Sequence, residues 1–189
     1  MDKTFNIVIS GVGGQGLITL LKIISQAALD EGFDVKTSEL HGLSQRGGSV
    51  EVYIRFGPKV FSPMIPKGQA NLIIALEQQE ALNGAQVAFK KSIFLINEYQ
   101  TATLGNDISL EEVRQKVESI TKRFYIIPAS KICQQELGNE VVSGVYLLGY
   151  ALRKKLLPLK LESIEEAIKK VMPEKFWSLN LKALGLTKK

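Results

Sequence analysis

The sequence contains almost no cysteine: Cys133 is the only one among 189 residues. A single thiol excludes a disulfide within the chain, and it excludes an iron–sulfur cluster or a zinc site held by the chain's own thiolates. Because it falls within a predicted helix, we expect Cys133 to be a core residue and not a nucleophile. Such sparse cysteine is typical of a reducing compartment, so we expect a cytoplasmic protein.

Long apolar runs are also missing, since none reaches the ~20 residues that a membrane span requires. The first ten residues, MDKTFNIVIS, lack the basic region and cleavage site of a secretory signal. The formal net charge of +5 is modest and spread along the chain, and no aromatic residues alternate with a basic stripe. We therefore expect neither a membrane anchor nor a nucleic-acid partner.

Catalytic and metal-binding patterns are equally scarce. His41 is the only histidine, and no Ser-His-Asp order, metal-ligand spacing or phosphate-loop lysine occurs. Glu77 and Glu80 follow a predicted buried strand, where they are better explained as acids in the first turn of a short helix than as a catalytic pair. The sequence therefore offers no self-contained active site.

The most prominent stretch that is present runs from Ile7 to Gly16 and reads IVISGVGGQG. Its apolar start predicts a buried strand, and the glycines at 11, 13, 14 and 16 predict a tight turn. The following LITLLKIISQAALDEG has the spacing of a helix. Such a unit lets the backbone amides approach a neighbouring group closely. The free amides at the start of the helix can bind an anion.

Alternating strand and helix patterns predict one domain over residues 1–189, of a length that buries about 70% of the unfolded surface. We expect the first two strands to pair in parallel through a right-handed crossover, and a hairpin to make the sheet mixed. The predicted fold is a three-layer α/β/α, Rossmann-like domain with a mixed, mostly parallel sheet and a helical C-terminus. The expected strands are residues 5–9, 33–38, 50–56, 70–76, 92–97 and 123–127, with a short antiparallel return at 60–61.

Two capping boxes predict helix starts, one at Ser109 with Glu112 and one at Ser163 with Glu166. Further helices are expected over residues 17–31, 130–137 and 141–156 and beyond Pro173.

A second polar, glycine-rich segment follows the second predicted strand and reads ELHGLSQRGG over residues 39–48. In a parallel sheet it lies at the carboxyl ends of the strands, beside the first glycine turn. Glu39 and His41 could share acid–base work, but with no further catalytic group in view we favour a role in fixing the loop or in a subunit contact. The polar residues and glycines of this segment are Glu39, His41, Gly42, Ser44, Gln45, Arg46, Gly47 and Gly48.

The first turn also satisfies the dinucleotide-binding pattern G-x-G-x-x-G, through Gly11, Gly13 and Gly16. Glu39 follows Gly16 by 23 residues, near the position of the acid that binds a ribose. However, the run GGQG is more open than the motif requires, and a second glycine-bearing loop follows Glu39 directly. A free-standing Rossmann-like dinucleotide-binding protein is therefore the alternative interpretation.

Three segments carry a resemblance that covers essentially the whole chain: GVGGQG at 11–16, ELHGLSQRGG at 39–48 and SVEVYIR at 49–55. Together they resemble the gamma subunit (domain III) of the 2-oxoacid:ferredoxin oxidoreductases, nearest to the beta-subunit type of indolepyruvate:ferredoxin oxidoreductase. Further matching segments are residues 76–77, 80–82, 137–139 and 179–183.

The resemblance implies a required subunit of an enzyme that oxidatively decarboxylates a 2-oxoacid, such as an aryl pyruvate or pyruvate, to an acyl-CoA while reducing ferredoxin. It also implies that thiamine diphosphate, magnesium and [4Fe-4S] clusters are carried by partner subunits, and that the isolated chain is inactive and binds none of these cofactors alone. The apolar surface left by a missing partner favours a homodimer of the isolated chain.

Because both glycine loops are expected at one edge of the sheet, we expect them to contact the catalytic subunit or coenzyme A. The residues expected to make this contact are Gly11, Gly13, Gly14, Gln15, Gly16, Glu39, Ser44, Gln45, Arg46, Gly47 and Gly48.

Overall fold

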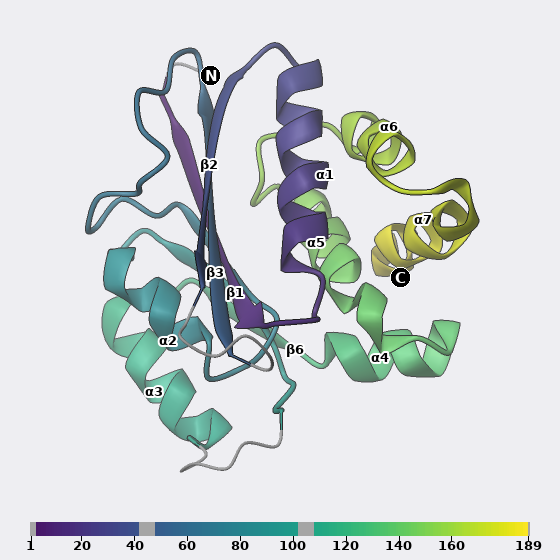
Figure 1. The fold of residues 1–189 in the computed structure, drawn as a ribbon. Helices are drawn as coiled ribbons and strands as arrows, with labels where there is room; N and C mark the ends of the chain where they lie inside the picture. The colour runs from purple at the N-terminus through teal and green to yellow at the C-terminus, as the bar shows by residue number, and fades with distance from the viewer. Residues whose placement is uncertain (1–2, 42–47, 102–107, 189) are drawn as a thin grey trace.

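A computed structural model describes residues 3–41, 48–101 and 108–188, in which a six-stranded sheet lies between two layers of helices (Figure 1). The strands are β1 (Phe5–Val12), β2 (Asp34–His41), β3 (Ser49–Gly57), β4 (Leu72–Ala75), β5 (Ile93–Asn97) and β6 (Phe124–Ile127). The helices are α1 (Leu17–Asp30), α2 (Ala81–Gly84), α3 (Leu110–Ile120), α4 (Ala129–Leu137), α5 (Ser143–Arg153), α6 (Leu161–Val171) and α7 (Trp177–Gly185). Short 3-10 helices occupy Ala85–Val87, Glu140–Val142, Glu174–Phe176 and Leu186–Lys188.

The sheet is mixed, as predicted. Strands β1, β4, β5 and β6 pair in parallel, and β3 pairs antiparallel with both β1 and β2. The resulting order, β2-β3-β1-β4-β5-β6, shows that the predicted pairing of β1 with β2 is wrong, because β3 lies between them. Only residues 42–48 connect β2 to β3, which is too short for a crossover helix, so β3 returns antiparallel and takes the position beside β1.

The chain after β3 forms no strand over residues 58–71, so the predicted antiparallel return at 60–61 is wrong. Side chains of β2 and β3 hold this segment instead. The Asp34 carboxylate accepts the Val60 N–H at 2.8 Å, and the Arg55 guanidinium donates to two backbone carbonyls of the segment, each at 2.8 Å. Each of these bonds satisfies a backbone group that a sheet ladder would otherwise pair.

Different helices cover the two faces of the sheet (Figure 1). Helices α1, α4, α5, α6 and α7 lie on one face, and α2 and α3 lie on the other. Residues of β1 alternate accordingly, since Ile7 and Ile9 belong to the core that includes Leu20 of α1, while Val8 belongs to the core that includes Val113 of α3. None of the described helices is long and apolar enough to cross a membrane.

Helix starts were predicted with mixed success. The capping box at Ser109 is confirmed at the start of α3, but the one at Ser163 is wrong, because α6 begins at Leu161. The Glu31 carboxylate, at the end of α1, accepts the Lys160 N–H at 2.7 Å. A residue distant in sequence therefore fixes the start of α6, and the local pattern could not predict it.

Helices α5 and α7 approach closely at Gly149. A Cβ atom at this position would collide with the carbonyl oxygen of Leu184, which is backbone and cannot move aside. Most of α5 is buried, so the contact lies inside the larger of the two cores.

We expect Gly149→Ala to lower the free energy of unfolding by about 2 kcal/mol, because an overpacked core must shift its backbone. Urea unfolding followed by circular dichroism measures this change. Gly185→Ala is the matched control, since an added Cβ there meets no atom within 4 Å. An equal decrease in the free energy of unfolding in both variants would contradict the assignment of Gly149 to a close contact between helices.

Candidate functional site

The candidate site lies where the carboxyl ends of β1 and β4 meet. After β1 the chain passes to α1 on one face of the sheet, and after β4 it passes to α2 on the other face. Such a divergence between neighbouring parallel strands opens a crevice, which is where open α/β sheets bind their ligands. The glycine turn at residues 13–16 borders this crevice.

Specific contacts explain the glycines of the turn. The Gln15 Oε1 atom accepts the Val12 N–H at 2.8 Å, and a Cβ on Gly11 would lie only 2.7 Å from this same oxygen. Gly14 and Gly16 have φ of 102° and 84°, the left-handed region that side chains rarely adopt. Gly16 is also the residue from which α1 begins.

The structure places Gly48, the last residue of the second glycine-rich segment, beside the glycine turn. The Gly13 N–H donates to the Gly48 carbonyl at 3.1 Å, one step beyond the last β1–β3 pair, Val12 with Ser49. The intervening Ser44, Gln45, Arg46 and Gly47 lie outside the described residues, as does the side chain of His41.

Glu39 is not brought to the turn. It lies within β2, opposite Val52 of β3, so a whole strand separates it from β1. In a dinucleotide-binding fold the acidic residue ends the strand adjacent to the glycine turn. The position of Glu39 therefore does not support the alternative interpretation.

A carboxylate cluster on the α2 side of this edge escaped the sequence analysis. The Ser49 hydroxyl donates to Glu80 Oε2 at 2.5 Å, and the Asn83 amide donates to the same oxygen at 2.7 Å. Glu51 lies on the same face of β3, half-buried, and its Oε1 and the hydroxyl of the facing Ser10 make no hydrogen bond within the described residues. These contacts join residues of β3, β1 and α2 that are distant in sequence, so the sequence could not reveal them.

Glu77 has a different role from the one predicted. The short helix α2 begins only at Ala81, so Glu77 lies before it, almost fully buried. Its carboxylate accepts the N–H groups of Gln79 at 2.8 Å and Glu80 at 3.1 Å, which fixes the turn between β4 and α2. The prediction that Glu77 lies in the first turn of the helix was wrong, because residues 78–80 form a separate turn before α2 begins.

Burial controls the ionisation of these carboxyls. It raises the pKa of Glu51, and repulsion from Glu80 raises that pKa further. Burial also raises the pKa values of Glu77 and Glu80, although hydrogen bonds to each carboxylate partly offset the effect. These three carboxyls therefore stay protonated to a higher pH than exposed glutamates do.

On the α1 side the same edge has two neighbouring hollows of about 130 and 220 Å³, which share the lining residues Gln15 and Val141. The larger one is mainly apolar, and its lining includes Val141 and Phe176, which are 63% and 42% exposed. Exposed apolar side chains beside a hollow are typical of a surface that another chain covers.

Buried hydrogen bonds hold the floor of the crevice. Asn97, at the end of β5, donates to the Leu76 carbonyl at 3.0 Å and to the Ser130 hydroxyl at 2.8 Å, and it accepts the Ser130 N–H at 3.2 Å. One amide thereby ties the ends of β4 and β5 to the start of α4.

The described residues lack the parts of a catalytic centre. No group of three or more histidine, cysteine, aspartate or glutamate side chains among them could hold a metal ion. Cys133 is buried in α4, as predicted, and burial raises the pKa of its thiol to about 11, so it is protonated at neutral pH.

We expect Glu51→Gln to be more stable than the wild type at pH 8, with the advantage shrinking as the pH falls to 4. A carboxyl whose pKa is higher in the folded chain favours folding while protonated, and this contribution is lost as the pH rises through the folded pKa. Urea midpoints between pH 4 and 8 measure the difference. Glu98→Gln, an exposed carboxylate, is the control; an equal gain there, or a gain that persists at pH 4, would contradict this account.

Comparison with known proteins identifies the family. The model of the family described as pyruvate ferredoxin/flavodoxin oxidoreductase matches residues 6–188. The indolepyruvate oxidoreductase subunit IorB of Archaeoglobus fulgidus is 39% identical over 187 residues, which cover 96% of this chain and 92% of that protein. The common subunit gamma of the pyruvate/ketoisovalerate oxidoreductases of Pyrococcus furiosus is 27% identical, covering 92% of this chain and 89% of that one.

Solved structures agree on the fold. The gamma subunit of a keto/oxoacid ferredoxin oxidoreductase from Geobacter sulfurreducens superposes with a TM-score of 0.71 at 21% identity, covering 96% of this chain and 95% of that chain. These findings confirm the predicted fold class and the predicted role as an oxidoreductase subunit, and they do not support a free-standing dinucleotide-binding protein. The chain belongs to the pyruvate ferredoxin/flavodoxin oxidoreductase family.

Proposed function

We propose that this chain is the subunit without thiamine in a 2-oxoacid:ferredoxin oxidoreductase that acts on indolepyruvate or related aryl pyruvates. The complex would decarboxylate the 2-oxoacid oxidatively to an acyl-CoA and pass the electrons to ferredoxin. The observation that carries this proposal is the 39% identity to an indolepyruvate oxidoreductase subunit over nearly the full length of both chains. Pyruvate is the second substrate to test, since the more distant gamma subunits are named for it.

The proposal assigns the cofactors to other subunits. Thiamine diphosphate, magnesium and [4Fe-4S] clusters are its expected cofactors, and a [4Fe-4S] cluster requires four thiolates where this chain has one cysteine. That cysteine is buried with a raised pKa, so it does not fit the role of a cluster ligand shared with a partner. A lone reduced thiol also suits a cytoplasmic complex.

The two glycine loops are the proposed surface toward the catalytic subunit and coenzyme A. The bond between Gly13 and Gly48 keeps them side by side, and glycine at positions 14 and 16 leaves the backbone without covering side chains. The start of α1 directly behind the turn favours an anion, so the coenzyme A phosphates are the ligand to test first. The residues proposed for this contact are Gly11, Gly13, Gly14, Gln15, Gly16, Glu39, Ser44, Gln45, Arg46, Gly47 and Gly48.

The proposal is tested by producing the chain together with its thiamine-binding partner under anaerobic conditions and measuring ferredoxin reduction. We expect reduction that depends on indolepyruvate and coenzyme A in the complex and none with the chain alone. Replacing Gln45 and Arg46 together by alanine should raise the Michaelis constants, or the dissociation constant of the complex, at least about tenfold, since central interface residues cost 1 to 2 kcal/mol or more.

The matched control replaces Arg114 and Gln115 by alanine, because this pair has the same two side-chain types at exposed positions on α3. The control should assemble and react like the wild type. A loop variant with unchanged assembly and unchanged Michaelis constants would remove the loops from the interface. A complex that reduces no ferredoxin with any 2-oxoacid would contradict the proposed activity itself.

A further inference from the structure

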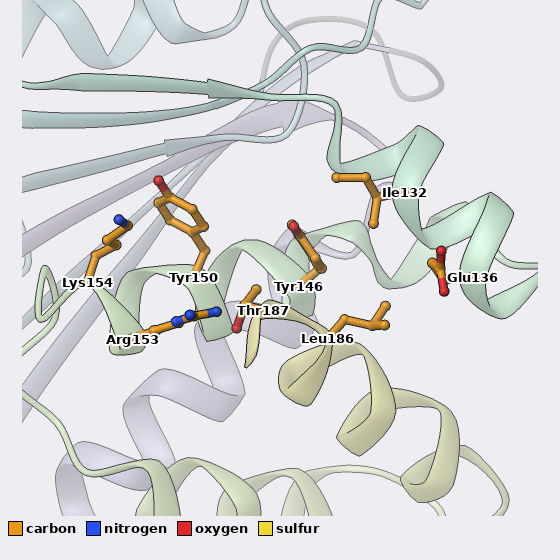
Figure 2. A pocket seen from close by; sticks show the side chains of 8 residues that line it. All are labelled: Ile132, Glu136, Tyr146, Tyr150, Arg153, Lys154, Leu186 and Thr187. Atoms are coloured by element: carbon orange, nitrogen blue, oxygen red, sulfur yellow. The ribbon is translucent and has the colours of Figure 1, made fainter. Parts of the chain in front are cut away.

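A second cavity lies away from the glycine loops, between α4, α5 and the C-terminal 3-10 helix (Figure 2). Its volume is about 370 Å³, within the range of small-molecule sites. Leu186 and Thr187, near the end of the chain, form one wall, and Ile132 of α4 faces them across the cavity. Nothing in the proposed function uses this cavity.

One face of α5 supplies the main lining. Tyr146, Tyr150 and Arg153 lie at intervals of four and three residues, and Lys154 is the next residue after Arg153, so all four lie on one side of the helix. Tyr150 is held in place, since its ring meets Tyr125 of β6 at 5.6 Å in an edge-on geometry. The cavity therefore has two aromatic side chains in its lining, one of which packs against β6.

The two ends of the cavity differ in charge. Arg153 and Lys154 lie at one end and Glu136 of α4 lies at the other, as Figure 2 shows. The Lys154 ammonium lies 5.8 Å from the centre of the Tyr150 ring. Arg153 already has a partner, but a guanidinium carries five N–H donors, so it can bind a ligand in addition. A bound anion would accordingly be drawn to the Arg153 end and repelled from the Glu136 end.

Tyr146 adds a polar group to the wall of the cavity. The residue is only 8% exposed, and its hydroxyl takes part in none of the hydrogen bonds seen between the described residues. The hydroxyl is not among the atoms fully closed off from solvent, and the residue lines the cavity. A polar group held in such a position is commonly satisfied by a ligand or an ordered water.

The geometry points to a site for a small aromatic carboxylate. Its carboxylate would lie against Arg153 and Lys154, and its ring would lie along the two tyrosines, between the apolar Ile132 and Leu186. The Tyr146 hydroxyl would donate to the ligand or accept from it. Glu136 would accept from an N–H or O–H group on the far side of the ring, so rings with such a donor are preferred.

This site is distinct from the edge that carries the proposed function. Helix α5 starts at Ser143 in the crevice behind the glycine turn and runs away from it, so Tyr150 and Arg153 lie two to three turns from that edge. Binding at this site can be measured on the full chain without its partner. Its failure would leave the oxidoreductase assay unaffected, and the failure of that assay would leave this site unaffected.

The test is isothermal titration calorimetry of the full chain with four probes. Indole-3-acetate carries both the ring and the carboxylate, indole-3-acetamide has the ring alone, and acetate has the anion alone. Adenosine monophosphate offers a different ring with a phosphate. We expect indole-3-acetate to bind at least about tenfold more tightly than the other three, because each of them lacks part of the match. Equal affinity for the amide, tighter binding of the nucleotide, or no heat from any probe would overturn the proposal.

Variants tie the binding to the cavity. Arg153→Gln should weaken indole-3-acetate binding about tenfold, and Tyr146→Phe, which removes only the hydroxyl, should weaken it about threefold. Arg114→Gln, on the opposite layer of helices, is the matched control and should leave the affinity unchanged. Lys154→Gln is a second charge variant in case Arg153→Gln unfolds, which circular dichroism reveals. Unchanged affinity in both charge variants, or the same loss in the control, would place the binding elsewhere.

Discussion

The antiparallel pairing of β3 with β1 is the constraint on which the proposed interface depends. It runs without a break from Phe5 opposite Phe56 to Val12 opposite Ser49 and is extended by the bond between Gly13 and Gly48. A slip of this register by one residue would turn every side chain of β3 to the other face of the sheet. The two glycine loops therefore adjoin because a whole strand fixes where each begins or ends.

The same edge separates two kinds of surface. On the α2 side lie glutamates whose pKa values are raised by burial, with Ser49 and Asn83 bonded to Glu80. On the α1 side lie hollows with apolar rims at Val141 and Phe176. Neither side holds a nucleophile beside a base in the described residues.

Local patterns were enough to predict the strand–turn–helix unit at residues 7–16, the capping box at Ser109 and the class of fold, because each depends on neighbours in the sequence. The order of the strands could not be predicted from local patterns. Whether β2 or β3 lies beside β1 depends on contacts between strands that are distant in sequence. The start of α6 depends on Glu31, 129 residues before Lys160. The cluster around Glu51 likewise needed the tertiary positions of α2 and β3 before it could be recognised.

The central claim is that the edge formed by the two glycine loops faces the catalytic subunit. Hydrogen–deuterium exchange of the chain, alone and in the complex, tests it most directly. We predict that peptides covering residues 11–20 and 39–49 become protected on assembly, while a peptide covering α3 on the opposite layer exchanges at the same rate in the free chain and in the complex. Protection confined to the α2–α3 layer, with both loops unchanged, would contradict it.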